Sequence, residues 1–198
     1  MSLLRITTLA TIAAAALALG AAAPSFAQMK NDGMMNSDKP VTVGGAPMYS
    51  SKNIIQNAVN SKDHTTLVAA VKAAGLVDTL QGAGPFTVFA PTNKAFDKLP
   101  KGTVETLLKP ENKDKLAAVL TYHVVAGRLS AKDLIEAAKR DGGQHKMKTV
   151  EGEELTVSAK VNTITIWDSK GNSSTITVQN VFQSNGVIHV IDGVLLPS

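Results

Sequence analysis

The spacing of apolar residues changes near His145, and this change limits the possible folds more than any other feature. Before His145, apolar residues recur at steps of three and four, the spacing of amphipathic helices. After it, short runs rich in Val, Ile and Thr follow one another, joined by tight polar connections suited to hairpins. Helices followed by adjacent antiparallel strands predict an α+β fold in one domain, without alternating βαβ units. The expected strands are Met147–Val150, Leu155–Ala159, Val161–Trp167, Thr175–Val178 and Val187–Ile191.

The helical part of the chain has recognisable start and stop signals. The longest helix is expected to begin at Asp63, which offers an N-cap, and to run to about Leu80 with one apolar stripe. Ser130 and Asp133 resemble a capping box for a helix that ends at Arg140, although Asp stands where Glu or Gln is usual. Further helices are expected over Asn53–Asn60, Ala95–Leu99, residues 102–108 and from Pro110 to about His123.

Two other segments each have the pattern of a short buried strand with a polar exit. They are Phe86–Phe96 (FTVFAPTNKAF) and Asn185–Pro197 (NGVIHVIDGVLLP), and Thr121–Val125 (TYHVV) lies between them. In this order, the three motifs resemble the two signature boxes and the Tyr-His motif of the fasciclin domain. The resemblance is to the single-domain, secreted bacterial type, and it covers nearly all of the chain after Tyr49.

This resemblance implies an antiparallel β wedge with helices packed along one side. It also implies that the two boxes lie side by side in the core, so that Val88 and Val190 are near neighbours. The family mediates adhesion, and the resemblance implies that its Tyr-His segment takes part in contacts. We expect the contact region to include this segment and the loops after Ala90 and around Ser184–Asn185. The expected binding residues are therefore Tyr122, His123, Thr92, Asn93, Ser184 and Asn185.

His123 has a second interpretation. It continues the apolar stripe of Leu116, Val119 and Leu120, so its imidazole could instead be buried, neutral and hydrogen-bonded to the backbone. In that case it would fix where the helix ends and the next strand begins. Thr92 and Asn93 are similarly suited to hold their loop by side-chain to backbone hydrogen bonds.

The N-terminus has the features of an export signal. Met1–Arg5 carries one positive charge, Ile6–Ala23 is apolar and rich in Ala, and small residues precede a cut after Ala27. We therefore expect a signal peptide over residues 1–27, with an uncleaved membrane anchor as the alternative. Residues 28–50 are expected to form a flexible leader and residues 51–198 the folded domain. The product would be periplasmic or extracellular, without stable membrane insertion after cleavage.

Composition argues against several classes of function. The chain has no cysteine, which rules out disulfides and thiolate metal sites. Its net charge is +4, with scattered lysines and no basic stripe or stacking platform, so we expect no nucleic-acid partner. Thioethers can hold Cu(I), but the methionines near the N-terminus are irregularly spaced and no His joins them. We expect neither a metal nor a cofactor; those methionines are Met29, Met34, Met35 and Met48.

No motif for catalysis is visible. Ser184, His189 and Asp192 could suggest a hydrolase triad, but no Gly-x-Ser-x-Gly elbow accompanies them. The glutamates around Gly152 flank a turn and are expected to be solvated rather than to face a sugar-sized cleft. We therefore expect a protein that is not an enzyme.

Two functions remain open. The first is adhesion or interaction at a cell surface or in a matrix, with a protein or polysaccharide partner. The alternative is a periplasmic carrier of a small apolar or lipid-like ligand held between helices and sheet. The carrier would require an open cavity lined by residues such as Leu67, Val71, Leu134 and Ile135.

Overall fold

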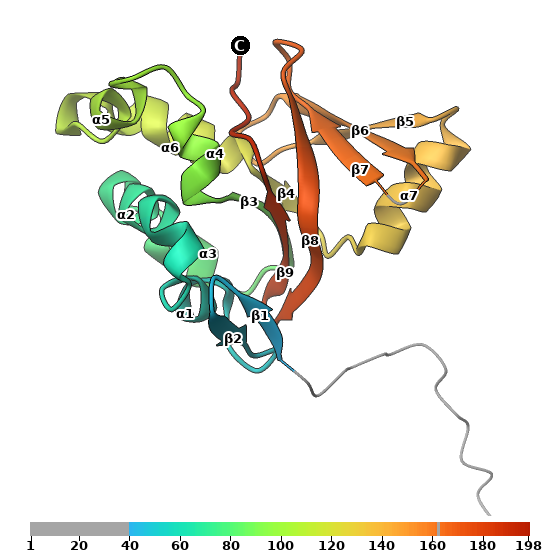
Figure 1. Cartoon of the computed structure of the whole chain (residues 1–198), viewed down its shortest axis with the longest axis horizontal. Coiled ribbons are helices and arrows are strands. Elements are labelled where there is room, and N and C mark those ends of the chain that lie inside the picture. The colour runs from blue at the N-terminus through green and yellow to red at the C-terminus, as the bar shows by residue number, and fades with distance from the viewer. Residues whose placement is uncertain (1–39, 162) are drawn as a thin grey trace, which may run out of the picture. The chain divides into compact units, whose positions relative to one another are not determined.

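A computed structural model of the chain describes residues 40–161 and 163–198 (Figure 1). The strands form a two-stranded hairpin and a seven-stranded sheet of order β4-β3-β9-β8-β7-β6-β5. The strands are β1 (Val41–Val43), β2 (Ala46–Met48), β3 (Phe86–Pro91), β4 (Val124–Ala126), β5 (Gln144–Lys148), β6 (Glu154–Lys160), β7 (Thr163–Trp167), β8 (Ser173–Gln183) and β9 (Gly186–Ile191). The helices are α1 (Ile54–Ala58), η1 (Lys62–His64), α2 (Thr65–Ala74), α3 (Val77–Gln81), α4 (Asn93–Asp97), α5 (Thr103–Leu107), η2 (Pro110–Asn112), α6 (Lys113–Tyr122) and α7 (Ala131–Arg140).

The two signature segments pair directly as β3 and β9, which confirms that they lie side by side. Val88 stands opposite Ile188, and Ala90 opposite Val190, so Val88 and Val190 are two positions apart in register. The pair is parallel, whereas all other pairings of the seven-stranded sheet are antiparallel. The expected antiparallel character therefore holds for the sheet except at this one pair, whose parallel direction was not anticipated. The long connection through α4–α7 and β4–β8 allows β9 to return in the same direction as β3.

The sheet bends until its two edge strands nearly meet. Beyond β5, Thr149 forms a bridge with Val125 of β4, and the Val150 amide donates to the Val124 carbonyl at 2.8 Å. The bend is concentrated in β8, whose pairing with β9 shifts register twice between Ile176 and Val181. The result is a near-barrel, with α7 packed against β5, β6 and β7.

Asn180 marks the bend of β8. It is the one residue other than glycine with a positive φ in the part of the chain that the structure describes, at 60°. Its side-chain oxygen accepts a hydrogen bond from the Ala131 amide at 2.8 Å, at the first residue of α7. The backbone of Asn180 thus lies at the bend, and its side chain holds the start of α7.

The buried apolar residues form two separate cores. One lies between the helices α1–α6 and the strands β3, β4 and β9, and contains Leu67 and Val71. The other lies inside the near-barrel and contains Leu134, with Ile135 at its edge. Leu67 and Val71 therefore belong to a different core from Leu134 and Ile135, and the four residues do not line one cavity. The carrier hypothesis was wrong in expecting a single cavity lined by all four.

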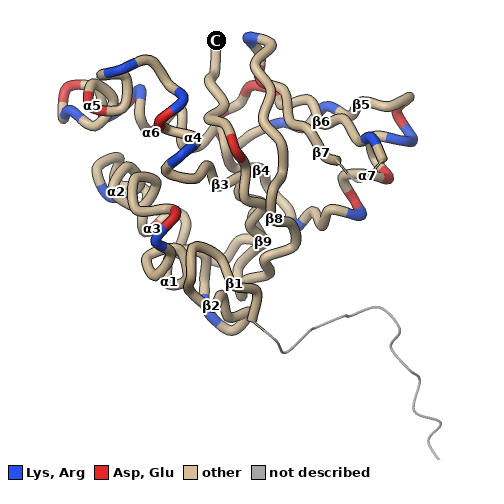
Figure 2. Tube along the Cα trace, viewed as in Figure 1, with Lys and Arg blue, Asp and Glu red and all other residues tan. Residues whose placement is uncertain are grey.

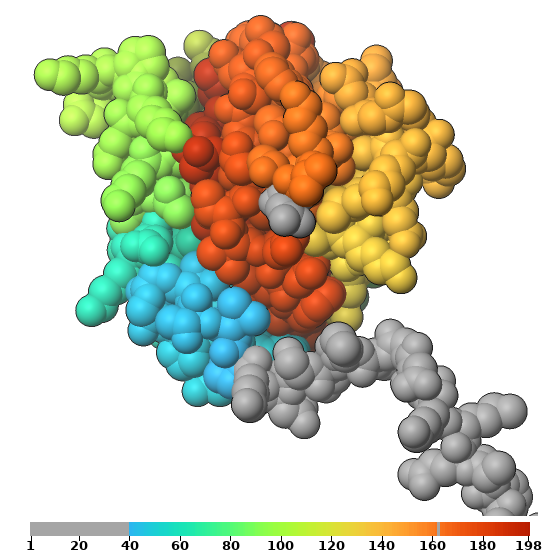
Figure 3. All heavy atoms as spheres, turned by 45° about the vertical axis from the view of Figure 1, so that its right-hand side comes forward, coloured from blue at the N-terminus to red at the C-terminus, as the bar shows by residue number. Residues whose placement is uncertain are grey.

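The last part of the expected leader is folded. The hairpin β1–β2 buries Val43 and Met48 in the first core and contacts α1 and β8. Figure 3 shows it, in blue, packed against the orange strand β8 without a gap. The folded domain therefore begins near residue 40 rather than 51, and Met48 is a core residue. The expected signal peptide, Met29, Met34 and Met35 lie outside the described residues.

The long helix expected from Asp63 to Leu80 is divided. Gly75 ends α2 in the left-handed conformation, with a φ of 72°, and α3 begins two residues later. The other helices have nearly the expected bounds. Ser130 and Asp133 form the capping box, since each side chain bonds to the other residue's backbone amide.

Charges of both signs are interspersed over the surface elements (Figure 2). Among the described residues, no helix combines the length and apolar character that crossing a bilayer requires.

Candidate functional site

Tyr122, the last residue of α6, is completely buried. Its hydroxyl donates a hydrogen bond to the Glu154 carbonyl at 2.9 Å and accepts one from the Ser169 amide at 3.0 Å. These bonds join α6 to β6 and to the β7–β8 turn. The phenol is therefore an internal connection, and it is not exposed to a partner as the resemblance led us to expect.

His123, directly after α6, is 2% exposed and both ring nitrogens are occupied. Nδ1 lies 2.7 Å from the Val119 carbonyl, and Nε2 accepts from the Leu195 amide at 3.0 Å. Since a carbonyl can only accept, the proton is on Nδ1 and the ring is neutral. Burial lowers the pKa of His123 to about 4. The structure thus shows the buried, backbone-bonded imidazole and not a contact residue.

Residues 195–198, which we term the C-terminal strap, are held by hydrogen bonds to His123 and to the two turns that flank Tyr122. Besides the bond from Leu195 to His123, the Leu196 amide donates to Asp168 Oδ2 at 3.0 Å. The Ser198 amide donates to both carboxylate oxygens of Glu153, at 3.1 and 3.0 Å. The strap therefore connects α6, the β7–β8 turn and the β5–β6 turn.

Thr92 and Asn93 follow β3 and connect α4 to α2. The Thr92 hydroxyl accepts from the Ala95 amide at 3.3 Å and so caps α4. The Asn93 side chain accepts from the Thr66 amide at 3.0 Å and donates to the Lys62 carbonyl at 2.9 Å. The predicted loop-holding role of both residues is confirmed.

Ser184 and Asn185 precede β9 and differ in exposure. Asn185 is buried; its side chain accepts from the Ile54 amide at 3.0 Å and donates to the Leu80 carbonyl at 2.8 Å. It therefore connects α1 and α3 to the sheet. Ser184 is exposed, and its carbonyl accepts from Arg128 at 3.1 Å.

The six predicted binding residues do not form one surface. Because β3 and β9 are parallel, Thr92 follows the end of the pair at Pro91 and Ile191, whereas Asn185 precedes its beginning at Phe86 and Gly186. The two ends of a six-residue strand are roughly 17 Å apart. Of the six residues only Ser184 is exposed, because the others are used in internal contacts.

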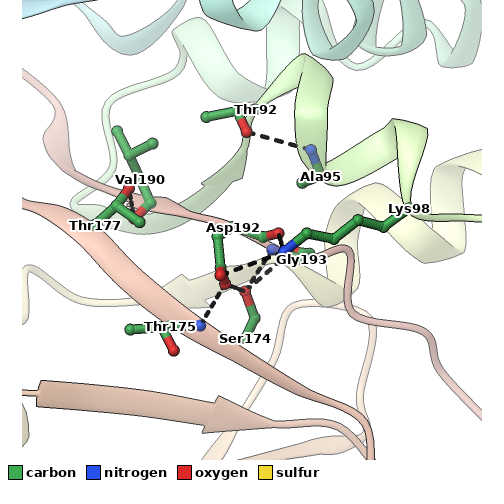
Figure 4. Close-up of polar contacts among 9 residues, drawn as sticks. All are labelled: Thr92, Ala95, Lys98, Ser174, Thr175, Thr177, Val190, Asp192 and Gly193. Carbon is green, nitrogen blue, oxygen red and sulfur yellow. Dashed lines mark hydrogen bonds and ion pairs between the residues drawn. The ribbon is translucent and has the colours of Figure 1, made fainter.

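A polar cluster at the end of β9 was not predicted (Figure 4). Asp192 Oδ1 accepts from the Thr175 amide at 2.8 Å and from the Ser174 hydroxyl at 3.3 Å. Lys98 Nζ donates to the Asp192 carbonyl at 2.6 Å and lies 3.3 Å from its Oδ2. Partial burial raises the pKa of Asp192, but the Thr175 amide and Lys98 together lower it more. Lys98 lies 94 positions from Asp192, so no sequence spacing indicates the pair.

The arrangement gives no support to hydrolysis. His189 is buried; Nε2 lies 2.9 Å from the Leu129 carbonyl and Nδ1 accepts from the Asn180 amide at 3.3 Å. Both ring nitrogens are therefore occupied by groups other than Ser184 and Asp192. Within residues 40–161 and 163–198, no group of three or more His, Asp or Glu side chains is placed to hold a metal ion.

Comparison with known proteins identifies the family. The model of the fasciclin domain matches residues 62–197, and the chain belongs to this family. It is 45% identical to protein sll1483 of Synechocystis over 91% of the chain and 90% of that protein. It is 34% identical to the cell surface glycolipoprotein MPB83 of Mycobacterium bovis over 81% of the chain and 68% of that protein.

The fold also matches a solved structure, a FAS1 domain pair from the insect cell adhesion molecule fasciclin I. The TM-score is 0.66 at 19% identity, and the match covers 73% of the chain and 51% of the solved one. The chain thus spans about half of that domain pair, and the match establishes the α+β fasciclin fold.

Proposed function

We propose that the protein is an exported, non-enzymatic fasciclin-domain protein that binds a protein or polysaccharide at a cell surface or in the surrounding matrix. The observation that carries this proposal is the similarity over most of the chain to a relative named as a cell surface glycolipoprotein. The polar side chains of the signature segments are engaged inside the fold, so recognition would use the exposed surface around them.

The hydrogen bonds of His123, His189 and Ser174 within the fold favour a binding function over a catalytic one. The histidines His123 and His189 have both nitrogens bonded to the backbone, which leaves neither free to act as a general base. The Ser174 hydroxyl accepts from the Gly193 amide at 2.8 Å and lies against Asp192 without an adjacent imidazole. Such a serine lacks the base that would activate it.

A single domain of this kind needs several copies for firm attachment, because linked binding sites raise apparent affinity by about 10²–10⁴-fold. The test is to display the exported protein at high density on beads and to measure their attachment to cells of the source organism. Beads with the protein should attach and soluble monomer should compete only weakly. Attachment no greater than that of beads carrying an unrelated protein of similar charge would contradict surface binding.

A further inference from the structure

A cavity of about 50 Å³ lies in the first core, between the helices α1–α3 and the strands β3 and β9. Its lining is almost wholly apolar. Buried side chains such as Leu67, Val71 and Ile188 form its deeper part, and the half-buried Ala58 and Val68 lie toward solvent. His123 of the Tyr-His segment also lines the cavity, but both of its ring nitrogens are bonded elsewhere, and no residue of the cluster around Asp192 takes part in the lining.

One polar side chain in this lining lacks a partner. His64 is 3% exposed, and its Nδ1 lies 2.9 Å from the Ser61 hydroxyl. Its Nε2 is the one buried side-chain nitrogen or oxygen without a hydrogen bond in the described part of the chain. A weak backbone interaction with Ala90 raises the pKa of His64 and partly offsets the effect of burial, but it does not have the geometry of a full hydrogen bond to Nε2. Buried polar groups almost always form a hydrogen bond, so a bound molecule that pairs with His64 Nε2 would be stabilised there.

The protonation of the imidazole determines which ligand group could form a hydrogen bond with Nε2. The Ser61 hydroxyl can donate to Nδ1 or accept from it, so Nε2 is either a donor or an acceptor. A hydroxyl group can pair with both tautomers, whereas a carbonyl can pair with only one. Burial lowers the pKa of His64, so the neutral ring offers an anion no charge partner at Nε2. Lys72 is the one charged residue among the described residues of the lining, and it is exposed to solvent.

We propose that this cavity binds a small neutral alcohol with an apolar body, whose hydroxyl pairs with His64 Nε2. The apolar part of the alcohol would fill the cavity beside Leu67, Val71 and Ile188. Such binding is independent of the surface-binding function proposed above, so either can fail while the other stands.

The cavity must widen for most such ligands. An apolar cavity of about 150 Å³ accommodates benzene, so about 50 Å³ is too small for a ring without movement. The helices on its outer side are short: α1 and α3 have five residues each, and Gly75 separates α2 from α3. An outward shift of α1 and α3 would enlarge the cavity without breaking the pairing of β3 with β9.

Benzyl alcohol and toluene provide a matched pair of probes that differ by one hydroxyl. Each is titrated into the isotopically labelled exported protein, and affinities are taken from amide shifts in α1–α3. The measured quantity is the ratio of the benzyl alcohol affinity to the toluene affinity. The two probes differ in the free energy needed to leave water, but this difference is the same for every variant. A change of the ratio between variants therefore reports the contacts inside the cavity. In His64→Phe the ratio should fall about ten-fold, the factor of one hydrogen bond to a buried group.

Two further variants keep the test decisive. Ala58→Leu fills the cavity and should weaken both probes, whereas Ala117→Leu, half-buried against the same core but outside the cavity lining, should weaken neither. If His64→Phe does not fold, His64→Gln serves instead and should retain part of the preference through its amide. An unchanged ratio in the His64 variant, or no shift in α1–α3 with either probe at its solubility limit, would overturn the proposal.

Discussion

His123 Nε2 accepts a hydrogen bond from the Leu195 amide at 3.0 Å, across 72 positions of the chain. The bond joins the end of α6 to the C-terminal strap, and Asp168 and Glu153 hold the next residues of the strap. The Tyr-His motif and the end of the second signature segment therefore act as one structural unit. This relationship explains why a histidine suits the position, since Nδ1 must donate while Nε2 accepts.

Replacement of His123 by alanine should lower the free energy of unfolding by about 2–4 kcal/mol. The change leaves the Leu195 amide without its partner and opens a cavity at the junction. Urea unfolding followed by circular dichroism would measure the loss. His145→Ala is the matched control, because this partly exposed ring pairs only with Asp141 near the surface and its loss should cost less than about 1 kcal/mol. Equal losses in the two variants would contradict the structural role of His123.

Acid should destabilise the protein already below neutral pH. His123 has a pKa of about 4 when folded, against an ordinary value of 6.5, so the unfolded chain binds more protons between these values. Its contribution, about 3 kcal/mol, is complete above pH 6.5 and is lost as the pH falls toward 4. Burial lowers the pKa of His64 and His189 as well, so both act in the same direction.

The measurement is the urea midpoint at half-unit steps from pH 7.5 to 4.5. The midpoint should fall steadily below about pH 6.5, which is the ordinary range of histidine titration. His123→Gln, which cannot titrate, should show a shallower fall from a lower starting stability. A midpoint that stays constant down to pH 5 would contradict neutral, buried histidines.

The sequence predicted local features well and long-range ones poorly. The Ser130 capping box and the apolar stripe of α6 depend on neighbours three or four residues away, and both are found. The parallel pairing of β3 with β9 and the closure of β4 against Thr149 depend on the path of the whole chain. Strand propensity is nearly the same for either direction of pairing, so local patterns could not decide between them.

The candidate site was found only in part for a similar reason. Asn93 and Asn185 were recognised as polar residues at strand ends, but their partners lie in other elements. For Asn185 the nearest such partner in sequence, Gly82, is 103 positions away. A polar residue at a strand end is equally consistent with a contact surface and an internal bond, and only the tertiary structure distinguishes them.

The Asp192 cluster should show an asymmetry between its two charged residues. Lys98→Ala removes an exposed ion pair and should cost less than about 1 kcal/mol. Asp192→Ala leaves the Thr175 amide without its acceptor and should cost about 1–3 kcal/mol, whereas the Ser174 hydroxyl can still donate to the Gly193 carbonyl at 3.2 Å. Thermal and urea unfolding of both variants would test this order, and a larger loss in Lys98→Ala would reverse the assignment of Asp192 as the central residue.

The hairpin β1–β2 should be required for full stability, although the family match begins only at residue 62. Met48 is 4% exposed and lies in the first core, where it also lines the cavity beside His64. Met48→Ala should therefore cost about 2–4 kcal/mol, as expected for a buried methionine. Tyr49→Ala, at an exposed neighbouring side chain, should cost less than about 1 kcal/mol and serves as the control. Urea unfolding compares the two variants, and if Met48→Ala is as stable as Tyr49→Ala, residues 41–48 do not belong to the folded domain.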